Sequence, residues 1–274
     1  LEMGQAGKLT KTGLRMEMGI AKRMVEKYRP VFNKQVISIS TNTERTKASM
    51  AAFLVSVQQE VPDAAIEAGI IEGEDPILRF VDLNKAYLNY QAQGYWHEIL
   101  KTFEKRKPMQ KQILGKLFKP KFIAEVSEDF VSEIYKIYCN QFDIVGDFKL
   151  GQLFTLEELK FLWENENLRQ YLEKGPSWKG QCLPTNIAFP LLMDFLAQAD
   201  RAIKGSGVGA HLRFAHAETI IPFSGLLRMN GFFNQMYQVE HVAKIWQDYW
   251  VAPMAANLQW IFYKGTQEQS VLMK

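Results

Sequence analysis

Apolar residues recur at helical spacing near the start of the chain and then change to the alternation of a strand. A helix is predicted over residues 10–28, ending near Pro30. The residues of its apolar stripe are Leu14, Met18, Ile20, Ala21, Met24 and Val25. The stretch VISIS at residues 36–40 alternates branched apolar residues with serine, which favours a strand. A second helical stripe follows at once, and Thr41 with Glu44 fits the T-x-x-E capping box. The pattern predicts strand, tight turn and helix.

Helical spacing continues through the middle of the chain, and strand-like alternation disappears there. Helices are predicted near residues 86–104, 127–142, 155–173 and 186–203. Thr155 and Glu158 form another capping box, and Gly175 followed by Pro176 ends that helix. The middle of the chain is therefore predicted to be all-helical.

Strand-like alternation returns near the end of the chain. AHLRFAH at residues 210–216 predicts a strand, a helix is predicted from Glu218 onward, and the tail from residue 254 predicts one or two strands. The chain is thus predicted to be α/β at both ends, with an all-α domain inserted between two halves that build one sheet. The predicted boundaries are 1–84 and 206–274 for the α/β core and 85–205 for the helical insertion.

Candidate chemistry gathers where the predicted strands end. Ligands of open α/β sheets bind beyond the carboxyl ends of the strands, which is where the predicted topology places Thr41, Arg45, His216 and Glu218. A cation such as Arg45 is unfavourable in the first turn of a helix, and a bound anion would resolve that conflict. If there is no anion site, Arg45 is an exposed arginine paired with Glu44 or Glu60, and His216 is a buried, hydrogen-bonded core histidine. Glu218 favours a ligand site, because a carboxylate at a strand-to-helix turn is unlikely to be buried unless it has an interaction partner or a catalytic role.

Composition narrows the class of protein. The chain has 274 residues, 47% hydrophobic content and a net charge of +3, which supports a real core and argues against a dedicated nucleic-acid binder. Two cysteines are too few for a disulfide framework or a four-cysteine zinc site. Phosphate-loop, serine-hydrolase and zinc-protease motifs are absent, so no cofactor or metal is expected. No run approaches the ~20 apolar residues of a membrane span.

The largest charge asymmetry lies in residues 103–122, with seven Lys or Arg against one Glu. Lys105, Arg106 and Lys107 are its densest part and are candidates for binding a polyanionic substrate. Two alternatives are a solvated helix face and a scaffold that binds nucleic-acid phosphates or other proteins.

Several motifs together resemble the histidine acid phosphatases, in the branch of the multiple inositol polyphosphate phosphatases and phytases of bacterial type. They are GKLTKTG at 7–13, STNTER at 40–45 with SMAAF at 49–53, HLRFAHAET at 211–219 and PMAANLQ at 253–259. The resemblance implies a phosphoglycerate-mutase-like sheet domain with an inserted all-α domain. It also implies a small phosphorylated substrate, with no nucleic-acid partner, and a periplasmic or extracellular location.

The same resemblance implies residue roles. In that family a histidine of an Arg-His-Gly motif attacks phosphorus and forms a phosphohistidine. By position, Arg45 corresponds to a phosphate-binding arginine, His216 to the second histidine and Glu218 to the proton donor, with Thr41 beside them.

The chain departs from the family at the nucleophile, because no Arg-His-Gly occurs in these 274 residues. The family has that motif in a first strand upstream of residue 7 and continues beyond residue 274, so we expect an intact protein longer at both ends. We expect these residues alone to be inactive. The alternative is a pseudoenzyme that binds inositol phosphates without hydrolysing them.

Overall fold

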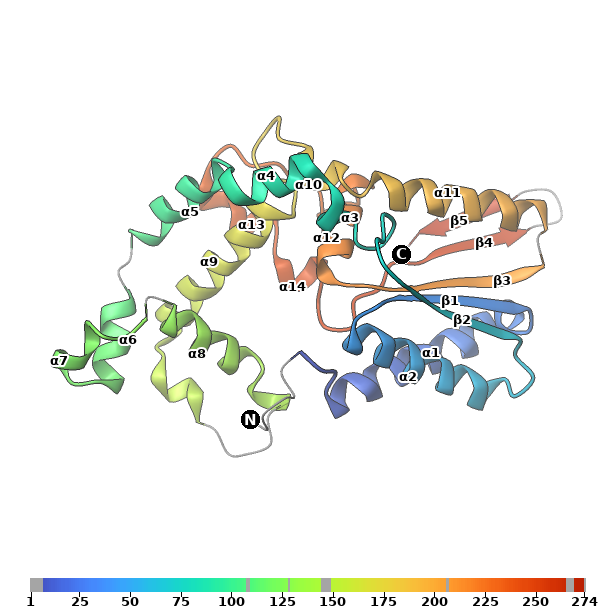
Figure 1. The fold of residues 1–274 in the computed structure, drawn as a ribbon, viewed down its shortest axis with the longest axis horizontal. Helices are drawn as coiled ribbons and strands as arrows, with labels where there is room; N and C mark the ends of the chain where they lie inside the picture. The colour runs from blue at the N-terminus through green and yellow to red at the C-terminus, as the bar shows by residue number, and fades with distance from the viewer. Residues whose placement is uncertain are drawn as a thin grey trace.

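Three parallel strands form the central sheet of the protein, seen in Figure 1 of the computed structural model. The structure describes residues 7–106, 109–127, 129–143, 149–205, 207–264 and 269–273. The central strand β1 (Gln35–Thr41) lies between β2 (Ile66–Ile71) and β3 (Val208–Phe214). Ser40 of β1 is level with Ile70 on one side and Phe214 on the other, so the carboxyl ends of the strands share one edge. The prediction that the two halves of the chain build one sheet is confirmed.

The strand β2 was not predicted. Its sequence IEAGII mixes a glutamate and a glycine into a short apolar run, and most of its residues are exposed at the edge of the sheet. The sequence of β2 therefore lacks the buried alternation by which strands are predicted.

Two helices, α1 (Lys11–Phe32) and α2 (Glu44–Glu60), cover one face of the sheet. Their shared core consists of Ala21, Val25, Tyr28, Phe32, Val36, Phe53, Val57 and Val61. The first helix does not end at Pro30 as predicted. Tyr28 leaves the helical conformation at φ −125° and ψ 35°, the chain kinks, and a further turn continues to Phe32, which the core buries.

Helix α11 (Phe189–Lys204) and a separate antiparallel hairpin lie on the other side of the sheet (Figure 1). The hairpin strands are β4 (Trp260–Lys264) and β5 (Gln269–Met273), which confirms the strands predicted for the tail. Asp194 of α11 pairs with Arg213 of β3, so this helix of the predicted insertion contacts the sheet directly.

The remaining helices form the elongated part at the left of Figure 1 and its junction with the sheet. They are α3 (Phe80–Leu83), α4 (Lys85–Gln93), α5 (Trp96–Glu104), α6 (Met109–Leu117), α7 (Pro120–Ile123), α8 (Phe130–Cys139), α9 (Leu156–Glu173), α10 (Leu183–Asn186), α12 (Ala217–Leu226), α13 (Val242–Ile245) and α14 (Asp248–Val251). Short 3-10 turns lie at Gln141–Asp143, Leu150–Leu153 and Val239–His241.

The helical predictions hold in outline. The capping box of Thr155 and Glu158 is present at the start of α9. The helix predicted over 86–104 is two helices, because Gly94 adopts an extended conformation between α4 and α5. No helix among the described residues is long and apolar enough to cross a membrane. The division into a core of 1–84 and 206–274 and an insertion of 85–205 stays a prediction.

Candidate functional site

The level register of β1 and β3 brings the two predicted motifs together at the carboxyl edge of the sheet. Thr41 is the last residue of β1, and Arg45 lies in the first turn of α2. His216 is the N-cap of α12, two residues after β3 ends, and Glu218 lies in the first turn of that helix. The chain therefore turns helical before Glu218, and His216 and Glu218 do not share one extended segment.

The predicted capping box of Thr41 and Glu44 is wrong. The N-cap of α2 is Thr43, and its side chain makes no capping bond. Thr41 stays in the strand, where its hydroxyl lies 2.8 Å from the Thr46 hydroxyl and 3.0 Å from His216 Nε2. Its side chain is thus used by the site rather than by the helix start.

A chain of hydrogen bonds links Arg45 to His216 and Thr41. Arg45 Nη2 lies 3.0 Å from His216 Nδ1, and because a guanidinium only donates, Nδ1 is the acceptor. Nε2 then carries the proton and donates to the Thr41 hydroxyl, which can donate to Thr46. The Thr46 hydroxyl in turn donates to the Thr43 carbonyl at 2.9 Å. Every group in the chain is satisfied when the imidazole is neutral.

His216 is held in that neutral form. The residue is only 6% exposed. Burial, followed by the charges of Arg79 and Arg45, lowers the pKa of His216 to about 4, against a smaller raising effect from Glu218. An anion bound beside the two arginines would offset their charge and raise the pKa of this imidazole.

Glu218 has a partner that the sequence analysis missed. Lys174, the C-cap of α9, places its ammonium 3.3 Å from Glu218 Oε1, and the two side chains are 8% and 37% exposed. Burial raises the pKa of Glu218, but Lys174, a backbone N–H bond and His216 together outweigh it and leave the pKa below its ordinary value. Glu218 is therefore ionised in the resting protein.

A cavity of about 360 Å³ opens beside this network. Its lining residues are Thr41, Asn42, Thr43, Arg45, Ile71, Gly73, Asp75, Arg79 and His216. Arg79, like Lys174, was missed by the sequence analysis, because nothing in its local sequence distinguishes it from a surface arginine. The cavity combines two arginines with the N-terminal end of α2, the arrangement that proteins use to bind anions.

The sequence matches a model of a known protein family. The model of the histidine phosphatase superfamily (branch 2) matches residues 1–273.

The chain belongs to the histidine phosphatase superfamily, branch 2.

Solved structures of a multiple inositol polyphosphate phosphatase and of a phytase have the same fold. The Bifidobacterium longum multiple inositol polyphosphate phosphatase in complex with inositol hexasulfate is 21% identical, with a TM-score of 0.84 over 98% of this chain and 73% of that one. Its phosphate complex is 20% identical, with a TM-score of 0.82 over 98% and 74%. The phytase from D. castellii is 16% identical, with a TM-score of 0.71 over 97% and 59%. A search of curated protein sequences found no match.

The alternative of an exposed arginine paired with Glu44 or Glu60 holds for the exposure of Arg45 but not for its partner. Glu44 pairs with Lys47 at 2.7 Å and Glu60 with Lys22 at 3.9 Å, while Arg45 contacts His216. The alternative of a satisfied core histidine fits His216 only in part, since the residue is buried and hydrogen-bonded but also lines a cavity.

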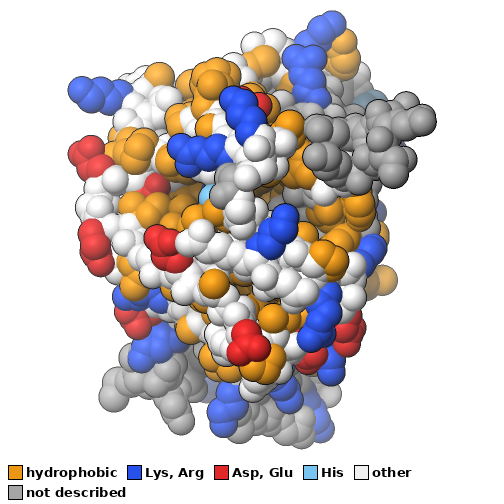
Figure 2. Space-filling view, turned by 90° about the vertical axis from the view of Figure 1, so that its right-hand side faces the viewer, with side chains coloured by type: hydrophobic (Ala, Val, Ile, Leu, Met, Phe, Trp, Pro, Cys, Tyr) orange, Lys and Arg blue, Asp and Glu red, His pale blue; other side chains and the backbone are white. Residues whose placement is uncertain are grey.

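The basic candidates lie elsewhere in the structure. Lys105 and Arg106 follow α5, at the end of the molecule away from the sheet in Figure 1, and neither lines the cavity within the described part of the chain. Arg106 pairs with Glu240. Lys107 lies outside the described residues. On the face that Figure 2 shows, basic and acidic side chains are interspersed, and neither sign forms a continuous patch.

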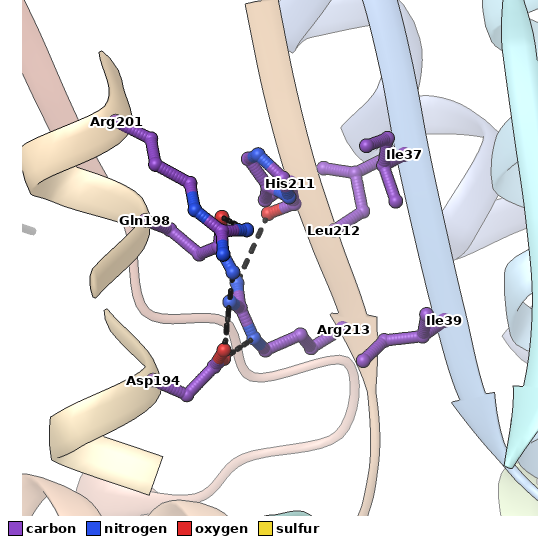
Figure 3. A pocket seen from close by; sticks show the side chains of 8 residues that line it. All are labelled: Ile37, Ile39, Asp194, Gln198, Arg201, His211, Leu212 and Arg213. Carbon is purple, nitrogen blue, oxygen red and sulfur yellow. Dashed lines mark hydrogen bonds and ion pairs between the residues drawn. The ribbon is translucent and has the colours of Figure 1, made fainter. Parts of the chain in front are cut away.

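A second cavity, of about 210 Å³, lies between α11 and the sheet rather than at the strand ends (Figure 3). Arg213 reaches from β3 to Asp194 on α11, with Nε 2.7 Å from the carboxylate, and the ring of Phe195 lies beneath the guanidinium. Ile37 and Ile39 of β1 form its apolar wall. Arg213 is neutralised by Asp194, so an anion gains little from it, while Arg201 of α11 also lines this cavity.

Proposed function

We propose that the intact protein is a phosphomonoester hydrolase that acts on inositol polyphosphates through a phosphohistidine intermediate. The observation that carries this proposal is the buried neutral His216, fixed by Arg45 and Thr41 at the wall of a cavity that a second arginine also lines. Membership of the histidine phosphatase superfamily supports the reaction class. The fold shared with an inositol polyphosphate phosphatase and a phytase supports the substrate class.

In the proposed reaction, Arg45 and His216 hold the oxygens of the phosphoryl group. The nucleophilic histidine, which we expect in an Arg-His-Gly segment that these residues do not contain, forms a bond to phosphorus while the ester P–O bond breaks. Glu218 in its acid form donates a proton to the leaving alkoxide. Water then cleaves the phosphohistidine, and Glu218, now a carboxylate, takes up a proton from that water.

Glu218 must gain a proton before it can act as the donor, because Lys174 and a backbone N–H bond keep its pKa low in the resting protein. Glu218 lies two residues after His216, which lines the cavity, so a polyphosphate bound there adds negative charge near the carboxylate. A like charge raises the pKa of an acid. The substrate itself therefore favours the protonated form that the reaction needs.

The 274 residues by themselves are proposed to bind phosphate esters without hydrolysing them, since they contain no Arg-His-Gly. The basic residues Lys105, Arg106 and Lys107 are proposed to attract the remaining phosphates, and export from the cytoplasm stays a proposal from the family resemblance. The alternative is a pseudoenzyme that binds inositol phosphates and catalyses nothing, which the same Arg45 and His216 geometry would serve.

The test is phosphate release from inositol hexakisphosphate by this chain and by a form extended through the upstream reading frame of its gene. We expect turnover only from the extended form, and Glu218→Gln should lower its kcat by roughly 10²- to 10⁴-fold. Glu26→Gln, an exposed carboxylate on α1, is the matched control and should change nothing. If the upstream frame encodes no Arg-His-Gly and neither form turns over, the pseudoenzyme is the better description.

A further inference from the structure

The cavity beside His216 contains a second arginine whose position the fold fixes as firmly as that of Arg45. Arg79 lies in the turn after β2, at the N-cap of α3, and its side chain is 30% exposed. Its Nε and Nη2 donate to the two oxygens of Asp82 at 2.7 and 2.9 Å. A guanidinium has five N–H donors. Within the described residues, the other donors of Arg79 make no hydrogen bond.

The turn that carries Arg79 is tied to the helix that carries His216. Asp75 Oδ1 accepts hydrogen bonds from two backbone N–H groups of the turn, at 3.1 and 2.7 Å, and the Asp75 carbonyl accepts from Arg79 N at 3.0 Å. Thr219, in the first turn of α12, donates its hydroxyl to the carbonyl of Leu78 at 2.8 Å. Arg79 is thus preorganised relative to His216, and its charge contributes to the lowered pKa of that histidine.

The cavity is larger than one phosphate group requires. Its 360 Å³ equals the liquid volume of about twelve water molecules at about 30 Å³ each, and a phosphate has five heavy atoms. The volume also lies at the lower end of the range for small-molecule sites, about 300–1,000 Å³. Arg45 and His216 are in direct contact and define one anion position, whereas Arg79 is held separately by Asp82.

We propose that Arg79 binds a second phosphate of the substrate, next to the one held by Arg45 and His216, and so selects substrates with phosphates on neighbouring carbon atoms over monophosphates. This inference rests on the proposed function and deepens it. Asp82 orients the guanidinium by a bidentate pair, and the remaining N–H donors bind the non-reacting phosphate. Arg79 is then a determinant of specificity, while Arg45 acts on every phosphorylated substrate.

The test is isothermal titration calorimetry of the 274-residue chain with inorganic phosphate and with inositol hexasulfate, which is not hydrolysed. The variants are Arg79→Gln, Arg45→Gln and, as an exposed control on α1, Arg23→Gln. A hydrogen-bonded charge contributes about 1.5–3 kcal/mol, so Arg79→Gln should weaken hexasulfate binding roughly 10- to 100-fold. The Kd for inorganic phosphate should change less than about threefold, a small part of that effect. Arg45→Gln should weaken both anions, and Arg23→Gln neither.

The possible outcomes separate the inference from the proposed function. If Arg79→Gln weakens the binding of both anions equally, Arg79 contacts the same phosphate as Arg45. If it changes the binding of neither anion, Arg79 is not part of the site. Either result overturns the inference and leaves the proposed function standing. Failure of the unaltered chain to bind either anion would overturn both. The variant Arg79→Gln should still fold, because Asp82 is about half exposed and can be solvated without its arginine partner. Thermal melting of each variant verifies this.

Discussion

Protonation of His216 is the perturbation that most directly reports on the cavity. An ordinary histidine has a pKa near 6.5, and burial with the charges of Arg79 and Arg45 lowers that of His216 to about 4. Between these values the unfolded chain binds a proton at this position and the folded chain does not. The contribution of His216 to stability is therefore complete above pH 6.5 and is lost as the pH falls toward 4.

The size of the effect follows from the two pKa values. The gap between 6.5 and about 4, at about 1.4 kcal/mol for each pH unit, corresponds to a loss of about 3 kcal/mol of unfolding free energy at pH 4 and below. At pH 6 about 1% of His216 should be protonated, against about 75% of an unperturbed imidazole. A phosphate bound to Arg45 and His216 offsets the positive charge of the two arginines and should raise this pKa.

The assay is an NMR titration of the histidine ring signals, which are few because the chain has 4 His. The signal missing from His216→Asn identifies the residue. We expect a midpoint near pH 4 in the free chain and a midpoint at higher pH with saturating phosphate. A midpoint at pH 6 or above without phosphate would refute the reasoning, because it would mean that His216 is neither desolvated nor close to the two arginines.

Three further predictions concern neighbouring interactions. Lys174→Met removes the cation that lowers the pKa of Glu218, so the Glu218 carboxyl should titrate at higher pH in the variant, as measured by carboxyl ¹³C NMR. The ion pair stabilises the fold at neutral pH, and this stabilisation is lost as the pH falls through the Glu218 pKa. An unchanged Glu218 midpoint would contradict the pairing. Thr155→Ala removes the capping box of α9 and should lower the free energy of urea unfolding by about 1 kcal/mol, whereas Thr155→Ser should keep most of the stability of the unaltered chain. Equal stability of the two variants would argue against the cap. Asp194→Ala leaves Arg213, whose side chain is 10% exposed, without its carboxylate partner and should lower the free energy of urea unfolding by about 3 kcal/mol. Adding Arg213→Met should restore much of the loss, and a loss below about 1 kcal/mol would contradict the near-burial of the pair.

The sequence was sufficient to predict that Thr41 and Arg45 approach His216. Alternation located β1 and β3, parallel strands end at one edge, and the residues just beyond those ends must therefore meet. The Thr155 capping box was predicted for a similar reason, since both partners lie within one turn of chain. A local sequence pattern predicts a contact correctly when the geometry of one or two regular helices or strands is enough to bring the residues together.

Contacts made by packing could not be predicted in this way. Lys174 lies at the end of α9, and only the fold of the intervening chain brings it to Glu218. Arg79 depends on Asp75, Asp82 and Thr219, none of which marks the residue in the sequence. The motif at Thr41 matched a capping box, but the strand extends through Thr41 and the hydroxyl bonds to His216 instead, so tertiary contacts overrode a local signature.

The most direct test of the account is a crystal structure of the chain soaked with inorganic phosphate. We predict phosphate in the cavity at the carboxyl edge of the sheet, with its oxygens within hydrogen-bond distance of Arg45 and His216. Phosphate bound only outside this cavity, or a cavity that stays free of phosphate at saturating concentration, would contradict the claim that these residues form a phosphoryl-binding site.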